Sequence, residues 1–271
     1  MSLLFCLISD RVRNLVGKMS AEVTYLQVLQ YQNNIVTTEL GSYIYTTVLT
    51  LKGNLVTTSN ATLFYIHDPM CSWCWGFRPV WEQLEQQLST TVKIVYIVGG
   101  LAPDSDQPMA IPMQQTLAAT WQRIQQHIPG TEFNYDFWRD NNKTQPKRST
   151  YPSCRAVLAA KIQNPELEKA MILSIQQAYF LHTKNPSNID VLTDIATSIG
   201  LEPEQFRDDM ASQTVEMQLQ EQLQLARGLS VQGFPSLVLS NQDRLHAIPV
   251  DYNNSHTMQQ AITDITHPVN E

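Results

Sequence analysis

Basic residues, long apolar runs and cysteine are all scarce in this 271-residue chain. Lys and Arg number 18 against 25 Asp and Glu, which gives a formal net charge of −7. That balance argues against an extended surface for nucleic acid or for an anionic membrane. No apolar run approaches the roughly 18 residues needed to cross a bilayer. We therefore expect a soluble protein with neither a nucleic-acid nor a membrane partner.

The first residues do not follow the order of a secretory signal. Such a signal carries positive charge first and a longer apolar stretch after it, but here the apolar residues 3–8 precede Arg11, Arg13 and Lys18. We expect a cytoplasmic protein. In a reducing cytosol, a close pair of cysteines is more often catalytic or metal-binding than a structural disulfide.

Residues 1–60 differ in composition from the rest of the chain. Residues 41–58 are rich in Thr, Tyr and Val with a Lys-Gly-Asn break, a composition that suits a pair of strands. A loosely ordered extension, or a segment upstream of the start codon that the cell uses, is an open alternative. No chemistry depends on this segment, and we assign no role to its Cys6.

From Ala61 onward the pattern predicts an α/β unit. Residues 62–67 and 91–98 are short apolar runs typical of buried strands, and residues 77–88 place apolar side chains on one helical face. Strand, helix and strand within about 40 residues form a βαβ unit, whose strands should be parallel. Further signals indicate strands at 236–240 and 245–248 and a helix at 256–265.

The middle of the chain, residues 101–230, carries no convincing strand signal. Helical periodicity with Pro and Gly at the ends indicates five helices, at 113–128, 153–163, 165–181, 189–199 and 214–227. The sequence therefore predicts an α/β sheet built from residues 61–100 and 231–271, interrupted by an all-helical insertion at 101–230.

Two of the four cysteines lie in the stretch HDPMCSWCWG, residues 67–76. Cys71 follows a strand and opens a helix, where unpaired backbone N–H groups and the helix dipole favour the thiolate. Cys74 lies one turn later, close enough to attack a mixed disulfide formed by Cys71. We expect Cys71 to be an exposed nucleophile and Cys74 a buried resolving thiol. Ser72 and Trp73 between them are uncharged, which predicts a milder oxidant than a relative with histidine there.

Two other interpretations of the cysteine pair stay open. A zinc site normally needs four ligands, of which His67 could be a third and Cys154 or a distant histidine the fourth. An inert buried pair is the other alternative. We predict no bound metal.

A second landmark, Gly233-Phe234-Pro235-Ser236, precedes a predicted strand. Proline cannot donate to a sheet ladder, so it belongs at a strand's first residue or at an edge. In a thioredoxin-like fold a cis proline occupies this place beside the active-site cysteines and leaves the backbone of the preceding residue, here Phe234, free for a bound peptide. An ordinary trans loop proline is the alternative.

The segments CSWCWGF and GFPS, the helical insertion, and YPSCRA at residues 151–156 together resemble the DsbA-like thioredoxin superfamily, in particular its FrnE-like cytoplasmic branch. The resemblance runs from about residue 61 to residue 266. It implies a thioredoxin-like sheet with a large helical insertion, and a thiol:disulfide oxidoreductase or isomerase. It also implies that Cys71 and Cys74 are the redox pair and that Pro235 is the cis proline.

The resemblance further implies partners that are protein or small-molecule thiols and disulfides, glutathione among them, and no cofactor beyond a Cys71–Cys74 disulfide. Ser72-Trp73 differs from the Pro-His of periplasmic oxidants, so oxidation, reduction and isomerisation all stay open. Kappa-class glutathione transferases, a related branch, use a single Ser or Cys, and the presence of both cysteines argues against that alternative. A non-catalytic metal- or partner-binding module is the rival from another class.

Other side chains near the cysteines have two interpretations each. His67 and Asp68 could move a proton to or from Cys74, but local hydrogen bonds at the strand end are the favoured interpretation for His67. Trp73, Trp75 and Phe77 form either a platform for a peptide-like partner or part of the core, and Trp73 is the one expected to be exposed. We interpret Cys154, at the start of an apolar helix, as a buried structural thiol.

Overall fold

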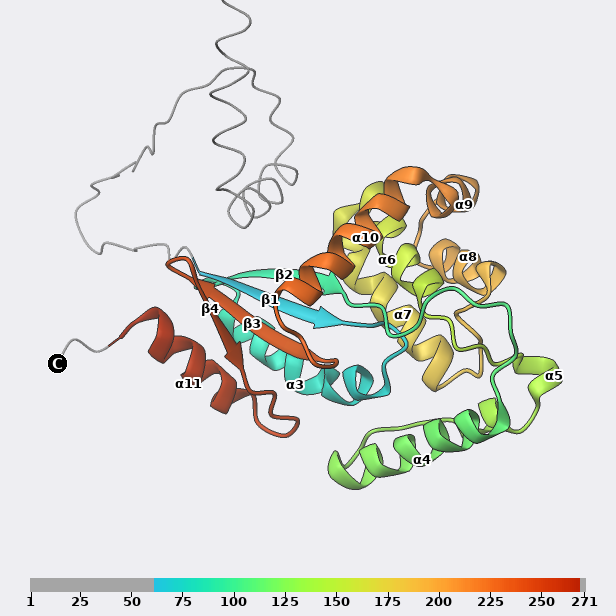
Figure 1. The fold of residues 1–271 in the computed structure, drawn as a ribbon, viewed down its shortest axis with the longest axis horizontal. Coiled ribbons are helices and arrows are strands. Elements are labelled where there is room, and N and C mark those ends of the chain that lie inside the picture. Colours follow the sequence, from blue (N-terminus) through green and yellow to red (C-terminus); the bar gives the residue numbers. More distant parts are fainter. Residues whose placement is uncertain (1–60, 269–271) are drawn as a thin grey trace, which may run out of the picture. The chain divides into compact units, whose positions relative to one another are not determined.

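A single mixed sheet of four strands organises the computed structural model, which describes residues 61–268 (Figure 1). β1 (Thr62–His67) pairs in parallel with β2 (Lys93–Val98) and antiparallel with β3 (Ser236–Asn241), which pairs antiparallel with β4 (Arg244–Ile248). The strand order is β2-β1-β3-β4. All four predicted strands and the parallel pairing of the first two are confirmed, whereas the strand pair predicted at 41–58 lies outside the described residues.

The central strand β1 is buried on both faces because helices cover the sheet from two sides. Leu63 and Tyr65 face a core that includes side chains of α3 (Ser72–Leu88) and α11 (Ser255–Thr266). Phe64 and Ile66 face a smaller cluster that includes Ala226 of α10 (Gln213–Gly228). A strand covered on both faces reads as a continuous apolar run, as residues 62–67 do.

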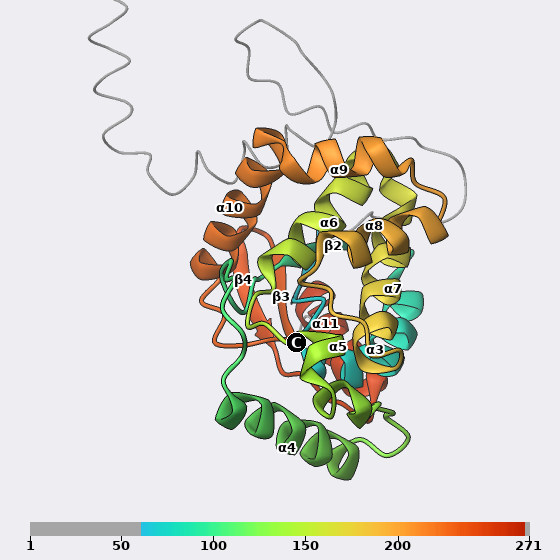
Figure 2. The same ribbon diagram turned by 90° about the vertical axis from the view of Figure 1, so that its right-hand side faces the viewer.

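The helical insertion is joined to the sheet by a continuous core, and Figures 1 and 2 show how its helices are arranged beside the sheet. Its helices are α4 (Ile111–His127), α5 (Asn141–Thr144), α6 (Tyr151–Gln163), α7 (Glu168–Phe180), α8 (Ile189–Ser198), α9 (Pro203–Ala211) and α10. In both views α4 lies apart from the group formed by α6 to α10. A second aromatic core, Trp121, Phe137, Tyr179 and Phe180, joins α4 to α7 and reaches Met70 beside the cysteines.

Several elements differ from the sequence predictions. α3 begins at Ser72 rather than at 77, because the Trp75 N–H already donates to the Cys71 carbonyl oxygen at 3.0 Å. The predicted helix 165–181 divides into a 3-10 turn, η2 (Pro165–Leu167), and α7. α9 was not predicted, because Phe206 is its one buried residue and a mostly polar run shows no apolar period. The short elements η1 (Tyr135–Trp138) and α5 were also missed.

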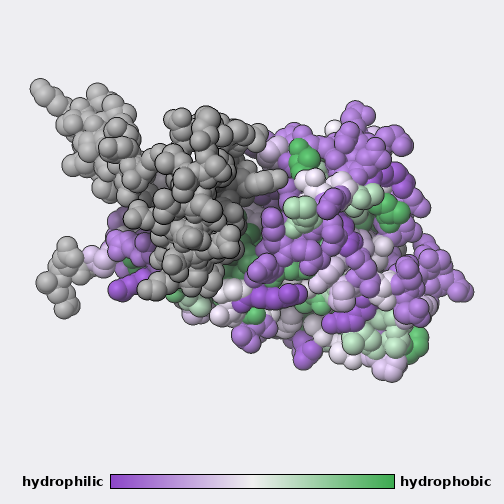
Figure 3. Space-filling model, turned by 45° about the horizontal axis from the view of Figure 1, so that its top comes forward, coloured by the Kyte–Doolittle hydropathy of each residue, from purple (hydrophilic) through white to green (hydrophobic). Residues whose placement is uncertain are grey.

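The visible surface is mostly polar. On the face drawn in Figure 3, hydrophilic residues predominate and hydrophobic ones form small, separate patches. Between residues 61 and 268, no helix combines the length and apolar character that crossing a bilayer requires.

Candidate active site

Three segments far apart in sequence meet at one end of the sheet. The register pairs His67 with Val98 and Ile66 with Ser236. The turn after β1, the segment after β2 and the loop before β3 therefore lie at the same end of the sheet. The cysteine pair lies on the first of these segments and Pro235 on the third, so the fold brings together residues that are 164 positions apart.

Cys71 is the N-cap residue of α3, with extended backbone angles of φ −77° and ψ 117°. Its N–H donates to the Asp68 carbonyl oxygen at 3.0 Å, and its thiol donates to the Phe234 carbonyl oxygen at 3.4 Å. The residue is only 6% exposed. The prediction of an exposed nucleophile is therefore wrong, because the loop before β3 lies against the sulfur.

Cys74 is fully buried within the first turn of α3, as predicted. Burial raises the pKa of its thiol well above the ordinary value, and the neighbouring Cys71 raises it further, while the Asp68 backbone N–H opposes the rise. Within the described residues Cys71, Cys74 and Cys154 are all free thiols. Ser72, the first residue of α3, is also buried.

The Asp68 carboxylate forms a buried network that sequence reasoning missed. Its oxygens accept hydrogen bonds from Met70 N at 2.8 Å, Leu101 N at 2.7 Å and the Thr150 hydroxyl at 2.6 Å. The Cys154 thiol lies 3.8 Å from the same carboxylate. Burial raises the pKa of the Asp68 carboxyl, and the bonds from these donors oppose that rise. One side chain thus connects the turn that carries the cysteines to the segment after β2 and to the start of α6.

Cys154 is fully buried, in agreement with its interpretation as a structural thiol. Burial, and then the negative charge of Asp68, raise the pKa of its thiol well above the ordinary value. Cys154 is therefore protonated at neutral pH.

His67 is also fully buried, and neither ring nitrogen has a hydrogen-bond partner among the described residues. Its ring stacks on Tyr65 at 5.2 Å between centroids and meets Tyr96 edge-on at 5.8 Å. Desolvation lowers its pKa to about 3. The expected local hydrogen bonds of this side chain are absent, and a neutral ring buried against aromatic neighbours cannot relay a proton to solvent.

The loop before β3 brings Phe234 onto the cysteine turn. The Phe234–Pro235 peptide bond is cis. The Phe234 ring lies so close to Gly99 that a β-carbon added there would stand 2.0 Å from a ring carbon. The same ring packs against the cluster of Phe64, Ile66 and Ala226. Gly99 is thus the residue that lets Phe234 approach the end of β2.

The three aromatic residues around the cysteines have different environments. Phe77 is fully buried, and Trp75 stacks on Phe180 at 5.7 Å while its Nε1 donates to the Glu132 carbonyl oxygen at 3.0 Å. Trp73 is half-buried and is the one beside which a partner could lie. Its ring contacts those of His127 at 5.9 Å and Tyr252 at 5.2 Å, neither of which was singled out from sequence.

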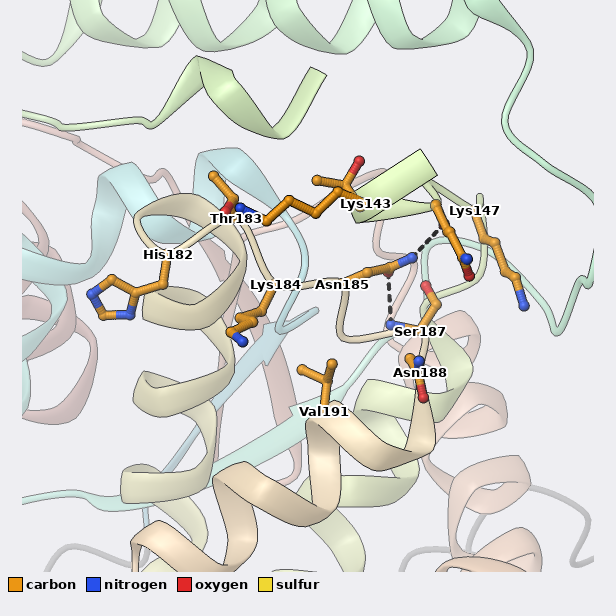
Figure 4. A pocket seen from close by; sticks show the side chains of 11 residues that line it. Lys143, Lys147, His182, Thr183, Lys184, Asn185, Ser187, Asn188 and Val191 are labelled. Atoms are coloured by element: carbon orange, nitrogen blue, oxygen red, sulfur yellow. Dashed lines mark hydrogen bonds between the residues drawn. The ribbon is translucent and has the colours of Figure 1, made fainter. Parts of the chain in front are cut away.

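The described part of the chain contains no group of three or more His, Cys, Asp or Glu residues placed to hold a metal ion. The zinc interpretation therefore lacks a ligand set there. A cavity of about 260 Å³ lies elsewhere, between the ends of α5 and α7 and the start of α8, and includes none of the predicted site residues (Figure 4). Its basic side chains do not converge, because the Lys147 amine points away from those of Lys143 and Lys184.

Comparisons with known proteins agree with this fold. A candidate protein disulfide isomerase from Nitrosomonas europaea superimposes with a TM-score of 0.67, at 24% identity over 77% of this chain and 98% of that one. The cytosolic disulfide reductase DsbM from Pseudomonas aeruginosa superimposes with a TM-score of 0.60, at 23% identity over 75% and 98% of the two chains. These likenesses show a DsbA-like fold, as predicted from sequence, whereas the narrower FrnE-like assignment stays a prediction.

Curated relatives carry another name. The ClpXP adapter protein SpxH of Bacillus subtilis is 25% identical over 196 residues, which are 70% of this chain and 63% of that protein. The SpxH of Halalkalibacterium halodurans is 24% identical over 180 residues, 65% of this chain and 57% of that protein. The chain thus matches less than two thirds of the length of these relatives. A family model described as Thioredoxin matches residues 64–259, from the first strand into the last helix, and this chain belongs to the thioredoxin family.

Proposed function

We propose that this protein is a thiol:disulfide exchange enzyme that reacts through Cys71 and Cys74. The observation that carries the proposal is the arrangement of the two sulfurs. One belongs to the N-cap residue of α3 and donates to the Phe234 carbonyl oxygen just before the cis proline, and the other is buried within the first turn. A helix start favours the anionic form of the first sulfur, and a second thiol within one turn provides the attacking group that completes the exchange.

The two cysteines and the partner disulfide together account for all the atoms and electrons of one exchange. In the reducing direction the Cys71 thiolate attacks one sulfur of a partner disulfide, forms a mixed disulfide and releases the partner's other sulfur as a thiolate. Cys74 then loses its proton and attacks the Cys71 sulfur, which releases the partner's second thiolate and leaves a Cys71–Cys74 disulfide. Two electrons pass to the partner, and two thiols, such as two glutathione molecules, restore the dithiol and become a disulfide themselves. The reverse sequence oxidises the partner. In isomerisation a second thiolate of the partner, in place of Cys74, attacks the mixed disulfide and releases Cys71.

Phe234 and Trp73 are the residues we assign to partner binding. The Phe234 carbonyl accepts from the Cys71 thiol only while the sulfur carries a proton. In a mixed disulfide that carbonyl is free to accept a backbone N–H of the partner, next to Pro235. The ring of Trp73, which lies between the two cysteines in sequence, is half-buried and offers apolar surface to a partner.

The similarity to DsbM supports reduction as the direction of the proposed exchange and the cytosol as its location. DsbM is described as a cytosolic disulfide reductase, and one of its structures is with GSH. We therefore propose glutathione or a protein thiol as the electron donor.

Trapping of the mixed disulfide tests the proposal. Cys74→Ser, incubated with a disulfide-bonded peptide or with oxidised glutathione, should accumulate an adduct at Cys71 that mass spectrometry identifies. Cys71→Ser should form none, and Cys154→Ser, the matched control, should turn over like the wild type. Absence of an adduct in Cys74→Ser would contradict the exchange mechanism.

The names of the curated relatives favour a second candidate, a protein-binding adapter. Binding of a partner protein would not require sulfur chemistry, so a Cys71→Ser/Cys74→Ser double variant should still bind its partner, and the wild type should lack reductase activity. This rival could also be a metal-binding module, which would require stoichiometric zinc. Metal analysis of the purified protein distinguishes such a module from a thiol:disulfide exchange enzyme. A kappa-type transferase would retain turnover with glutathione in Cys74→Ser, whereas an exchange enzyme would stop at the adduct.

A further inference from the structure

The turn that leads into Cys71 is held by one side chain. The Cys71 N–H donates to the Asp68 carbonyl oxygen at 3.0 Å, and the Met70 N–H donates to the Asp68 carboxylate at 2.8 Å. Pro69, which follows Asp68, has no N–H to donate and a fixed φ, which suits the second position of such a turn. Both N–H groups that follow Asp68 in this turn, residues 68–71, therefore bond to it.

The turn determines where the Cys71 sulfur lies. Cys71 is the N-cap residue of α3, so its backbone belongs both to the turn and to the start of the helix. Its thiol donates to the Phe234 carbonyl oxygen at 3.4 Å, and the residue is almost fully buried. A sulfur with so little exposed surface can be approached by a partner disulfide from few directions. A small displacement of the turn should therefore change its reactivity.

The second carboxylate oxygen of Asp68 anchors the turn to two distant segments. It accepts from Leu101 N, after β2, at 2.7 Å and from the hydroxyl of Thr150, the N-cap residue of α6, at 2.6 Å. The Thr150 hydroxyl also accepts from Ala102 N at 3.1 Å, and the Thr150 N–H donates to the Ala102 carbonyl oxygen at 3.0 Å. Asp68, Ala102 and Thr150 are all buried. The anchor is thus itself held in place by further hydrogen bonds.

We propose that Asp68 is a positioning residue of the exchange site: its carboxylate, anchored by Leu101 and Thr150, holds the turn that directs the Cys71 sulfur at an incoming disulfide. This role rests on the exchange function proposed above. It gives the helical insertion a part in the reaction, because Thr150 belongs to the insertion. Misplacement of a reacting group by about 1 Å can slow a reaction about 100-fold, so loss of the anchor should slow the attack by Cys71.

Two other roles of the same carboxylate would have different consequences. As a proton acceptor for Cys74 it would act on the second step of the exchange, but its oxygens are occupied by three donors. The Cys74 sulfur instead lies against the backbone N–H of Asp68. As a negative charge alone, the carboxylate would disfavour a nearby thiolate, and its removal would favour the attack at neutral pH. Only positioning predicts a slower first step.

The rate of mixed-disulfide formation measures that first step. The Cys74→Ser protein stops at the adduct, and Asp68→Asn in this background keeps the size of the side chain but replaces one acceptor oxygen with a donor group. The rate of adduct formation at Cys71 with a disulfide-bonded peptide, followed by mass spectrometry across a pH series, should fall about 10- to 100-fold on its alkaline plateau. Loss of a charge alone would move the midpoint to lower pH and leave the plateau unchanged.

The Thr150 hydroxyl provides a second, independent test in the same background. Thr150→Val removes the hydroxyl with little change of shape and should also lower the plateau, whereas Thr150→Ser, which keeps a hydroxyl, should react faster than Thr150→Val. This pair decides the question if Asp68→Asn does not fold, which far-ultraviolet circular dichroism checks for each variant. Asp140→Asn is the matched control, since the exposed Asp140 accepts from Lys143 N at 3.1 Å in another part of the insertion; its rate should equal that of the Cys74→Ser parent.

The outcomes separate the proposal from the exchange function on which it rests. An unchanged plateau in Thr150→Val, or in a folded Asp68→Asn, would overturn the positioning role, even if either variant were less stable. Slower turnover of Asp68→Asn with both cysteines present, together with an unchanged rate of adduct formation, would assign Asp68 to proton transfer at Cys74 instead. Failure of the Cys74→Ser parent to form any adduct would count against exchange itself.

Discussion

A β-carbon at residue 99 should disturb both the stability of the protein and the proposed thiol–disulfide exchange. In Gly99→Ala the new methyl group would lie 2.0 and 2.1 Å from two carbons at the far end of the Phe234 ring and 2.9 Å from a third. Carbon atoms in contact are ordinarily about 3.5–4.0 Å apart. The ring must therefore move by more than 1 Å or so, away from a cluster against which it already packs.

The expected cost follows from that displacement. Overpacking of a well-filled site typically lowers the free energy of unfolding by about 1–3 kcal/mol. Expulsion of the ring towards solvent would give a loss of similar size, because burying a whole phenylalanine side chain contributes about 1.5–3 kcal/mol and Phe234 is half-buried. The Phe234 carbonyl belongs to the same residue, so its 3.4 Å contact with the Cys71 sulfur should be lost as well.

Urea denaturation and the rate of exchange with a peptide disulfide measure the two effects. Gly233→Ala is the matched control: it lies in the same loop, its φ is not in the left-handed region, and nothing lies within 4 Å of its β-carbon position. We expect Gly99→Ala to lose about 1–3 kcal/mol of stability and to exchange more slowly than this control. Equal stability and equal exchange rates in the two variants would refute the inferred packing of Phe234 on residue 99.

Three further variants probe the polar groups beneath the site. The pKa of His67 falls from 6.5 to about 3 on folding, so the unfolded form binds the proton more tightly and stability is lost as pH falls below 6.5. His67→Phe should remove this dependence, so its free energy of unfolding in urea titrations at pH 4 should exceed that of the wild type by about 3 kcal/mol. Parallel curves of stability against pH for the two proteins would contradict this expectation. Thr150→Val removes the 2.6 Å donor to Asp68 and should cost about 1.5–3 kcal/mol in thermal or urea unfolding, whereas an unchanged midpoint would show that the bond contributes nothing. Cys154→Ala should leave adduct formation at Cys71 unchanged in mass spectra, because the buried, protonated thiol takes no part in exchange, and a slower rate would assign it one.

Local sequence patterns predicted the framework of this fold well. Continuous apolar runs gave β1 and β2, and the helical period gave the buried face of α3, because those signals depend only on neighbours a few residues away. The cysteine pair at the start of α3 and the proline before β3 were also predicted in the right places. These features could be predicted because they depend on nearby residues and because their segments resemble those of a known family.

The missed features depend on contacts between distant segments. The sequence suggests for Asp68 only a proton transfer to or from Cys74, because its partners Leu101 and Thr150 are 33 and 82 positions away. Tyr252 lies in a polar loop with no periodic signal. The exposure of Cys71 was predicted wrongly because the group that covers it, the Phe234 carbonyl, comes from 163 positions along the chain.

The way the insertion is attached to the sheet limits how the protein could be reduced in size. Asp68 accepts from Leu101 and Thr150, and the Gln222 side chain of α10 accepts from the Val98 N–H, the last amide of β2, at 2.8 Å. A miniature protein that joined residue 100 directly to residue 231 would keep the carboxylate and the amide but discard most of their partners. Such a design would therefore need new polar partners at both points before its shortened core could be expected to fold.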